Sequence, residues 1–413
     1  MSELPTPTEA TTTTAGLLSA IADTGRDRVR GGYSRPVFST AERELVDWYV
    51  AELDRRGLQA QTDRNGIVWA WWNPAGAPPE GAIVTGSHLD SVPGGGAFDG
   101  PLGVASALRA VDLLREREVA PARPLGLAVF PEEEGSRFGV ACLGSRLLTG
   151  AISAERALGL TDPDGNTFAD VARAAGLDPA GFGRDEQTLA RIGTFVELHV
   201  EQGRGLIDLG APVAVASSII GHGRWKFSVH GQGNHAGTTL LADRRDPLLA
   251  ASRLVVAVRE VAAAHPGTRA TVGRLQPVPG GTNVIASRVD LWLDVRHPED
   301  AVTRAVVAEI SRRAQELAAG EGCTVEVREE SFGGTVDFDP ALARRLTTTL
   351  GGVPTLPTGA GHDAGVLAEH VPTAMLFTRN PTGVSHSPEE FCTDDDAERG
   401  STALADVLAD LLT

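Results

Sequence analysis

Apolar and polar positions change their spacing several times along the chain, and each spacing predicts a type of element. From Thr40 to Arg56 apolar residues recur at helical spacing, and the pattern ends at Gly57. Similar spacing predicts helices at 103–117 and 141–148. Short apolar runs typical of buried strands lie at 67–72, 82–85, 125–130 and 194–200. This alternation predicts an α/β sheet with helices on its faces.

A region with a different pattern begins near Gly210. Strand-like runs lie at 225–230 and 288–295, with helical patterns at 247–264 and 299–319. Helix and strand patterns return at 340–350, 373–377 and 394–412. A length of 413 residues also exceeds one ordinary core. We therefore predict a partly disordered lead (1–30), a catalytic domain (31–211 and 328–413) and an inserted smaller α+β domain (212–327).

Composition narrows the class of protein. The formal net charge of −17 disfavours a nucleic-acid partner, whose phosphates would be repelled. No apolar run is long enough for a membrane span, and the N-terminal segment lacks the pattern of a signal peptide. The three cysteines, Cys142, Cys323 and Cys392, are far apart, as in a protein from a reducing compartment. These features predict a cytoplasmic protein without a membrane partner.

A single lysine, Lys226, stands among cationic side chains that are otherwise all arginine. A Walker A phosphate loop needs Gly-Lys followed by Ser or Thr, and this combination is absent. An amidase with a Cys-Glu-Lys site would have to use Lys226, which has no cysteine near it in sequence. The G-x-S-x-G motif of serine hydrolases is also absent. Hydrolases that depend on a lysine or on this serine motif are therefore disfavoured.

Polar residues follow three of the predicted strands at the point where each strand ends. They are His88 and Asp99 after the run at 82–85, Glu132–Glu134 after 125–130, and His199 after 194–200. Each cluster alone would more often be a surface turn or a solvated acidic loop. Because ligands bind at the carboxyl ends of strands in open α/β sheets, however, the clusters can meet in one crevice. The occurrence of all three clusters, each at the end of a predicted strand, therefore favours a binding site.

Imidazoles and carboxylates without thiolates are ligands that suit Zn²⁺, Mn²⁺, Co²⁺ or Ni²⁺. Asp90, two residues after His88, is placed to hold the second nitrogen of that imidazole. The consecutive carboxylates of Glu132–Glu134 would repel one another without a cation. With metal present, one can be a ligand while its neighbour acts as a general base. The pattern predicts a metal site, and it fits two divalent ions if one carboxylate bridges them.

Several motifs around these residues are specific in combination. They are GSHLDSVPGGGAFDGPLG (86–103), EEEGSRFG (132–139), ELHVEQG (197–203), GNHAGTT (233–239), GTNVIASRVDLWLDVRH (281–297), GAGHDA (359–364) and GVSHSPEE (383–390). Together they resemble the hydantoinase/carbamoylase branch of the M20 metallopeptidase-like amidohydrolases. The resemblance extends from about Gly31 to the C-terminus. It implies a phosphorylase/hydrolase-like, zinc-exopeptidase-type α/β catalytic domain and a ferredoxin-like insert that serves as lid and dimerisation domain.

The resemblance also implies a ligand set for two divalent metal ions, Zn²⁺ or Mn²⁺, with Co²⁺ or Ni²⁺ as alternatives. By motif, His88, Asp99 and His199 bind one ion. Asp99 bridges to the second ion, which Glu134 and His386 complete.

Catalytic and substrate-binding roles follow from the same resemblance. Glu133 is expected to be the catalytic base. Gln202, His235, Asn283 and Arg296 match positions that bind substrate. His235 is expected to reach the active site of the partner subunit in a homodimer, and to stabilise the reaction's oxyanion together with Asn283.

The expected reaction is hydrolysis of the ureido or carbamoyl C–N bond of a small carboxylic acid, with release of ammonia. Allantoate and N-carbamoyl-L-amino acids fit the motifs equally well. An M20-type peptidase or aminoacylase that cleaves an ordinary amide is the alternative within the enzyme class, and a non-catalytic binding protein is the alternative outside it. Whether His222 or His362 contacts substrate is left open by the sequence.

Overall fold

Two compact units form in the computed structural model, which describes residues 13–413. Among these residues, unit 1 comprises 13–218 and Asp337–Thr413, and unit 2 comprises Ile219–Val336. The bounds expected for the insert, 212–327, differ from these at both ends. Residues 213–218 lie in unit 1, because strand β6 (Val213–Ile219) pairs with β15 (Thr373–Thr378). Residues 328–336 lie in unit 2, because β12 (Thr324–Gly333) pairs with β7 (His222–His230) as far as Gly333.

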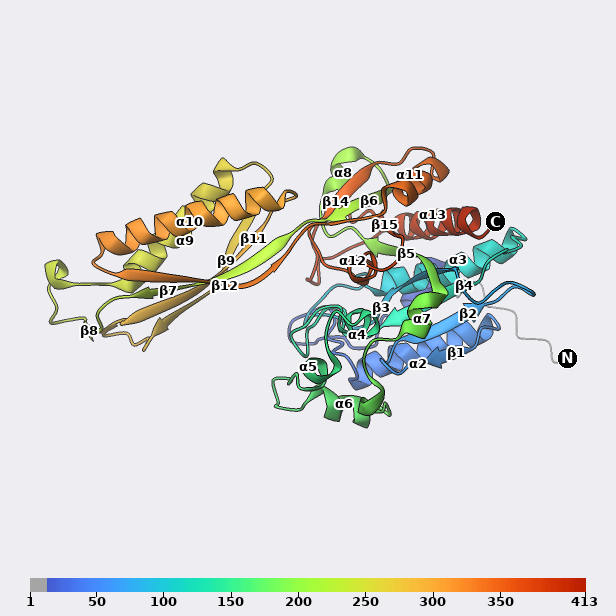
Figure 1. The fold of residues 1–413 in the computed structure, drawn as a ribbon, viewed down its shortest axis with the longest axis horizontal. Coiled ribbons are helices and arrows are strands. Elements are labelled where there is room, and N and C mark those ends of the chain that lie inside the picture. The colour runs from blue at the N-terminus through green and yellow to red at the C-terminus, as the bar shows by residue number, and fades with distance from the viewer. Residues whose placement is uncertain (1–12) are drawn as a thin grey trace. The chain divides into compact units, whose positions relative to one another are not determined.

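A nine-stranded sheet forms the centre of unit 1 (Figure 1). Its other strands are β1 (Ala60–Thr62), β2 (Val68–Trp72), β3 (Ala82–His88), β4 (Leu125–Phe130), β5 (Ile192–Val200), β13 (Val336–Asp337) and β14 (Thr355–Thr358). The order is β1-β2-β4-β3-β5-β15-β6-β13, and β14 pairs with β6. Strands β4, β3, β5 and β15 run parallel, so their carboxyl ends lie at the same edge of the sheet.

Helices α3 (Pro101–Glu116), α12 (Asp363–Leu367) and α13 (Asp394–Leu412) pack against the parallel strands of this sheet. The other helices of unit 1 are α1 (Thr14–Ala20), α2 (Thr40–Arg55), α4 (Leu143–Thr149), α5 (Ala154–Leu158), α6 (Phe168–Ala174), η2 (Pro179–Gly181), α7 (Glu186–Arg191), α8 (Gly205–Leu209) and α11 (Pro340–Thr349). Every residue of β3, β4 and β15 is buried. Burial on both faces explains why these strands read as continuous apolar runs.

The longer elements predicted for unit 1 are confirmed, with ends displaced by a few residues. The sequence did not reveal the short helices α5 to α8 or the edge strands, whose few residues carry little periodicity. Of the lead expected at 1–30, residues 1–12 lie outside the described residues, whereas α1 forms within the remainder. The Thr14 hydroxyl donates a hydrogen bond to Glu398 of α13 (2.9 Å), which fixes α1 against the C-terminal helix.

Unit 2 contains a four-stranded antiparallel sheet with the order β12-β7-β11-β9. Its remaining elements are β8 (Asn234–His235), η3 (Leu241–Asp243), α9 (Pro247–Ala264), β9 (Arg269–Val278), β10 (Val284–Ile285), β11 (Arg288–Arg296) and α10 (Asp300–Gly320). The chain order β-α-β-β-α-β with this strand order is ferredoxin-like. Helices α9 and α10 lie side by side against the sheet (Figure 1). The edge strands β9 and β12 are largely exposed, and polar residues interrupt their apolar ones, so no continuous apolar run marked them.

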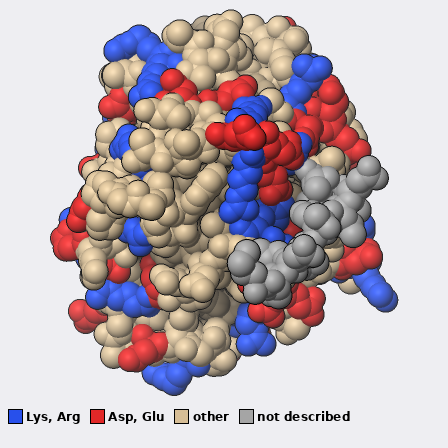
Figure 2. Space-filling view, turned by 90° about the vertical axis from the view of Figure 1, so that its right-hand side faces the viewer, with Lys and Arg blue, Asp and Glu red and all other residues tan. Residues whose placement is uncertain are grey.

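Charge and hydropathy of the folded chain agree with its composition. No helix within residues 13–413 is both long and apolar enough to cross a membrane. Figure 2 shows cationic and acidic side chains interspersed on one face of the molecule. Ion pairs such as Arg117–Asp406 and Arg345–Asp410, both 2.7 Å, hold opposite charges together on the surface.

Helix α2 begins at a capping arrangement that contains a buried glutamate. The Ser39 hydroxyl accepts a hydrogen bond from the Glu42 amide (3.2 Å), and the Glu42 carboxylate accepts one from the Phe38 amide (3.1 Å). This reciprocal pairing resembles a capping box. Only 4% of Glu42 is exposed, and burial, assisted by the charge of Asp90, raises the pKa of Glu42 from 4.5 to about 8.

Because the folded chain holds the Glu42 proton more tightly than the unfolded chain, this group stabilises the fold fully below about pH 4.5. Its contribution is lost as the pH rises towards 8. We predict that Glu42→Gln, which cannot lose a proton, gains stability relative to the wild type across that range. Urea unfolding at pH 5 and pH 8 measures the effect. Glu44→Gln, an exposed position on the same helix, is the control. If the stability difference between Glu42→Gln and the wild type were the same at both pH values, the prediction would be wrong.

Candidate metal centre

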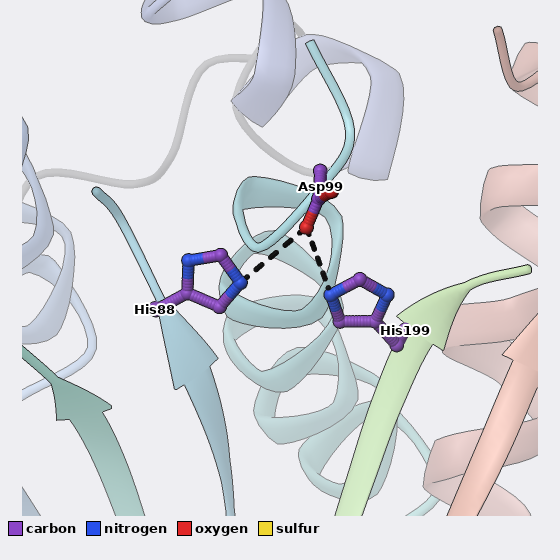
Figure 3. A group of neighbouring side chains, drawn as sticks. All are labelled: His88, Asp99 and His199. Carbon is purple, nitrogen blue, oxygen red and sulfur yellow. Dashed lines mark ion pairs between the residues drawn. The ribbon is translucent and has the colours of Figure 1, made fainter. Parts of the chain in front are cut away.

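Two histidines at the ends of neighbouring parallel strands face one aspartate. His88 ends β3 and His199 lies one residue before the end of β5, so strand pairing brings both to the same sheet edge. Asp99 lies in the loop before α3, and its Oδ1 is 3.5 Å from His88 Nε2 and 3.2 Å from His199 Nε2 (Figure 3). None of the three is more than 3% exposed.

The inner nitrogen of each imidazole faces a main-chain carbonyl. His88 Nδ1 lies 3.0 Å from the carbonyl oxygen of Asp90, and His199 Nδ1 lies 2.9 Å from that of Val200. A neutral ring that donates from Nδ1 has a lone pair on Nε2. Both Nε2 atoms are buried and have no hydrogen-bond partner among the described residues. In this neutral form the two lone pairs would face a carboxylate oxygen and repel it, and a cation between them would remove the repulsion. The donor set therefore fits a metal ion.

The role expected for the Asp90 side chain needs correction. Its main-chain oxygen, rather than its carboxylate, is the nearer partner of His88 Nδ1, because the carboxylate lies 3.6 Å away. The carboxylate oxygens instead accept hydrogen bonds from the amides of Glu133 and Glu134, each at 3.1 Å. Asp90 thus fixes the acidic loop relative to the end of β3.

The second oxygen of Asp99 faces another group of potential ligands. Asp99 Oδ2 lies 3.2 Å from His386 Nε2, which in turn lies 3.4 Å from Glu134 Oε2. In this group, as in the group of His88, Asp99 and His199, the potential ligand atoms lie within 4.8 Å of one another. Asp99 belongs to both groups, with one oxygen directed to each, which is the arrangement required of a carboxylate that bridges two ions.

Burial and the neighbouring ionisable side chains shift the pKa values of these groups. Burial opposes ionisation of Asp99, but the three imidazoles around it hold its pKa well below the usual range. Burial, followed by the charge of Asp99, raises the pKa of Glu134 to about 7. Hydrogen bonding to Asp99 outweighs desolvation and raises the pKa of His386 to about 9. Carboxylates are concentrated at this site, and both raised values show that it favours added positive charge.

Glu133 lies beside the two groups. Its Oε2 is 3.7 Å from His88 Nε2, and its Oε1 is 3.9 Å from His362 Nδ1. Burial, supported by neighbouring carboxylates, raises the pKa of Glu133 well above its ordinary value. The Cys142 thiol donates a long hydrogen bond to Glu133 Oε1 (3.6 Å). Cys142 is itself buried, and burial also raises the pKa of its thiol, which disfavours the reactive thiolate.

A third group with metal-ligand spacing contains Glu197, His199 and His362. Glu197 is fully buried and accepts hydrogen bonds from the Ser87 hydroxyl (3.2 Å) and the Ala364 amide (3.1 Å). The His362 and His199 rings lie 4.5 Å apart. The sequence contained a signal for Glu197, since it alternates with His199 on one face of β5.

Glycine is required where the Asp99 loop passes His88. Gly100 adopts φ +85°, and a Cβ added there would lie 2.6 Å from the His88 ring. Any side chain at this position would push the imidazole away from Asp99.

The four residues expected to bind substrate fall in three places. Gln202, in unit 1, donates a hydrogen bond from Nε2 to Asp99 Oδ2 (2.9 Å), and its Oε1 is buried without a described partner. His235 and Asn283 lie together in unit 2, because β8 pairs with β10 and the Ala236 amide donates to the Asn283 carbonyl (2.9 Å). Arg296 lies at the other end of the unit 2 sheet, where it faces His222 across β7 and β11.

The separation of these residues within unit 2 follows from strand register. Arg296 pairs with His222 at the start of β7, whereas Arg288 pairs with His230 at its end, next to the segments that carry His235 and Asn283. β7 has nine residues. At about 3.4 Å per residue, the two ends are roughly 27 Å apart. One unit 2 therefore does not bring Arg296 and the His235–Asn283 pair to the same small ligand.

The mixed sheet and its histidine–carboxylate cluster define a metal-dependent hydrolase of α/β type. The chain belongs to the peptidase family M20/M25/M40, whose model matches residues 84–410, and within it to the hydantoinase/carbamoylase group. The resemblance predicted from the motifs is thereby confirmed.

Relatives of known name span nearly the whole chain. An N-carbamoyl-L-amino acid amidohydrolase of Geobacillus stearothermophilus is 36% identical over 91% of this chain and 92% of its own. An allantoate amidohydrolase of Bacillus subtilis is 33% identical, with 92% of each chain covered. The crystal structure of a hydantoinase/carbamoylase family amidase from Burkholderia multivorans matches with a TM-score of 0.84 and 31% identity over 96% of each chain.

A more distant structure shares the fold alone. It is a Bacillus subtilis protein described as a dinuclear metal binding peptidase of the M20 family, with a TM-score of 0.60 and 16% identity over 96% of this chain and 98% of its own.

We predict that His386→Ala lowers the metal content from two ions per chain towards one, because His386 contacts only the Glu134 side of Asp99. Elemental analysis of purified protein measures this content. The exposed His370→Ala is the matched control and should keep the wild-type content. Full loading of the His386 variant at wild-type affinity would count against its role as a ligand.

Proposed function

We propose that the chain is an amidohydrolase that cleaves the ureido or carbamoyl C–N bond of a small carboxylic acid and releases ammonia. Allantoate and N-carbamoyl-L-amino acids are the substrates that the named relatives support. The observation that carries the proposal is the placement of Asp99, with one oxygen facing His88 and His199 and the other facing His386. A spare buried glutamate, Glu133, lies beside this arrangement.

The metal ligands of the proposal are His88, Asp99 and His199 for one divalent ion, and Asp99, Glu134 and His386 for the other. Zn²⁺ and Mn²⁺ suit these donors, and Co²⁺ or Ni²⁺ are compatible with them. When bound, the ions supply Lewis acidity towards the substrate carbonyl and towards water.

Glu133 is the proposed catalytic base. Its position 3.7 Å from His88 Nε2 places it next to the ligands, while neither of its oxygens is required by the two ligand groups that share Asp99. A carboxylate whose pKa is raised by burial takes up a proton more readily than an exposed one. In the proposed reaction Glu133 takes the proton from the attacking water and returns it to the leaving nitrogen.

Arg296 is the proposed partner of the substrate carboxylate. A guanidinium binds a carboxylate with two parallel hydrogen bonds, which lysine cannot reproduce. Arg296 is held by Asp294, which accepts from its Nε at 2.8 Å and from Nη2 at 3.2 Å. These contacts preorganise the guanidinium plane. Gln202 is the proposed unit 1 residue that binds the substrate's polar groups.

His235 and Asn283 are the proposed donors to the oxyanion. His235 Nδ1 accepts a hydrogen bond from the Gly237 amide (3.1 Å). The neutral ring therefore carries its proton on Nε2, which can donate to a developing negative charge. Asn283 lies beside it and offers an amide donor.

We further propose that the active protein is a homodimer, in which unit 2 forms the interface and closes over the substrate. If Arg296 and the His235–Asn283 pair bind the same small molecule, the distance of roughly 27 Å along β7 requires two copies to supply them. The partner subunit then contributes its own His235 and Asn283 to each site. We place the protein in the cytoplasm, because all three cysteines are free and buried.

Ammonia release tests the reaction directly. Zinc- and manganese-loaded protein is assayed with allantoate, a panel of N-carbamoyl-L-amino acids, and dipeptides and N-acyl amino acids as ordinary amides. We expect ammonia from ureido acids only. Cleavage of the ordinary amides without ammonia release from ureido acids would identify a peptidase or aminoacylase instead.

We predict that Glu133→Gln keeps both metal ions but lowers kcat by about a hundredfold or more, since the amide cannot accept the proton of the attacking water. Metal analysis and steady-state kinetics on the same preparation check both parts. Near-normal turnover in this variant would show that another group is the base.

We predict that mixing two inactive variants, Glu133→Gln and His235→Ala, restores activity after subunit exchange. A mixed dimer has one site with both an intact Glu133 and an intact His235 from the other chain, so random exchange recovers up to about a quarter of wild-type activity. If His235 acted within its own chain, every site in the mixture would stay defective and activity would not return.

A further inference from the structure

We infer that Glu390 is a positioning residue, which ties the loop carrying Asp99 to the loop carrying His386 and so sets the geometry of both proposed metal sites. The inference rests on the metal centre of the proposed function. It concerns a residue outside the ligand set, and the contacts of its carboxylate with both loops support it.

One oxygen of Glu390 holds the Asp99 loop. Glu390 Oε1 accepts hydrogen bonds from the amides of Phe98 and Asp99, both at 3.0 Å. Both amides lie in the loop that leads into helix α3, and Glu390 is only 4% exposed. Because the Asp99 amide is fixed, the direction in which the Asp99 side chain leaves the backbone is fixed as well.

The other oxygen holds the residue before His386. The Ser385 hydroxyl donates to Glu390 Oε2 at 3.1 Å, closer than the 3.4 Å that separates it from Asp99 Oδ2. The same hydroxyl accepts a hydrogen bond from Gln202 Nε2 (3.0 Å). The next residue, His386, adopts the left-handed backbone region with φ 55°, which an L-residue keeps only when its surroundings determine it. Glu390 is part of those surroundings.

Gly96 leaves the space that the Glu390 carboxylate occupies. A Cβ added at Gly96 would lie 2.2 Å from Glu390 Oε1 and 2.5 Å from Glu390 Cβ, so one of the two would have to move. Gly96 does not have a positive φ, and alanine is therefore compatible with its backbone conformation. Close approach to Glu390 is the reason for glycine at this position.

Glu390 acts through hydrogen bonds to neutral groups rather than through an ion pair. In residues 13–413, none of the ion pairs includes Glu390, and its three partners are two amides and a hydroxyl. A glutamine oxygen can accept from both amides, and its NH₂ group can donate to the Ser385 oxygen. Alanine can do neither.

The test measures metal binding to metal-stripped protein by titration calorimetry with Zn²⁺ and with Mn²⁺, together with thermal unfolding of the metal-free protein. In Glu390→Ala we expect the Kd of both ions to rise about tenfold or more, as is usual when a group that orients ligands is lost. Glu390→Gln should bind within about threefold of the wild type. Gly96→Ala should reproduce the loss seen in Glu390→Ala, since it displaces the same carboxylate. The exposed neighbour Glu389→Ala is the matched control and should bind as the wild type does.

The comparison of variants separates positioning from general stability. If Glu390→Ala does not fold, the other two variants still test the inference. A positioning role for Glu390 predicts that Glu390→Gln keeps the ions and that Gly96→Ala loses them. Wild-type affinity in a folded Glu390→Ala protein, or equal losses in the Gln and Ala variants, would overturn the inference alone. Failure of the wild type to bind either ion would instead refute the metal centre and the proposed function with it.

Discussion

The burial of several carboxylates at the carboxyl edge of the unit 1 sheet is the constraint on which this structure depends. Asp99, Glu133 and Glu197 are buried within a few ångströms of two imidazoles whose lone pairs face inward. Isolated carboxylates are costly to bury, and pairing with cations is the usual way to offset that cost. Here the nearest groups are imidazoles and other carboxylates, an arrangement that bound divalent ions would balance.

The fold holds two of the loops around this site, those of Asp99 and of Glu133–Glu134, with a carboxylate from another loop. Asp90 accepts from the amides of Glu133 and Glu134, and Glu390 accepts from those of Phe98 and Asp99. Main-chain amides are good partners for buried carboxylates, because they supply hydrogen bonds without adding a competing charge. Loops tied in this way can carry ligands to a fixed position although they have no regular secondary structure.

Much of this arrangement could be predicted from the sequence, because it depends on local signals. His88, Glu132–Glu134 and His199 each follow an apolar run, and parallel strands align such ends at one edge. The approach of His386 could not be derived in that way, since it comes from a loop near the C-terminus and only the family motif pointed to it. Glu390 was also not identified, because a second glutamate after a Ser-His-Ser-Pro segment has no periodicity that separates it from exposed Glu389. Strands β9 and β12 were missed because they are largely exposed and contain no continuous apolar run.

The length of β7 has a consequence for how the protein would behave on dilution. In the proposed homodimer the guanidinium and the oxyanion donors of one site come from different chains, so a single chain would lack a complete site. Below the concentration at which two copies associate, such a chain would retain its metal ions but lose turnover, since all the proposed ligands lie in unit 1. Specific activity would then decrease as the protein is diluted. The length of β7 would in this way make catalysis depend on self-association.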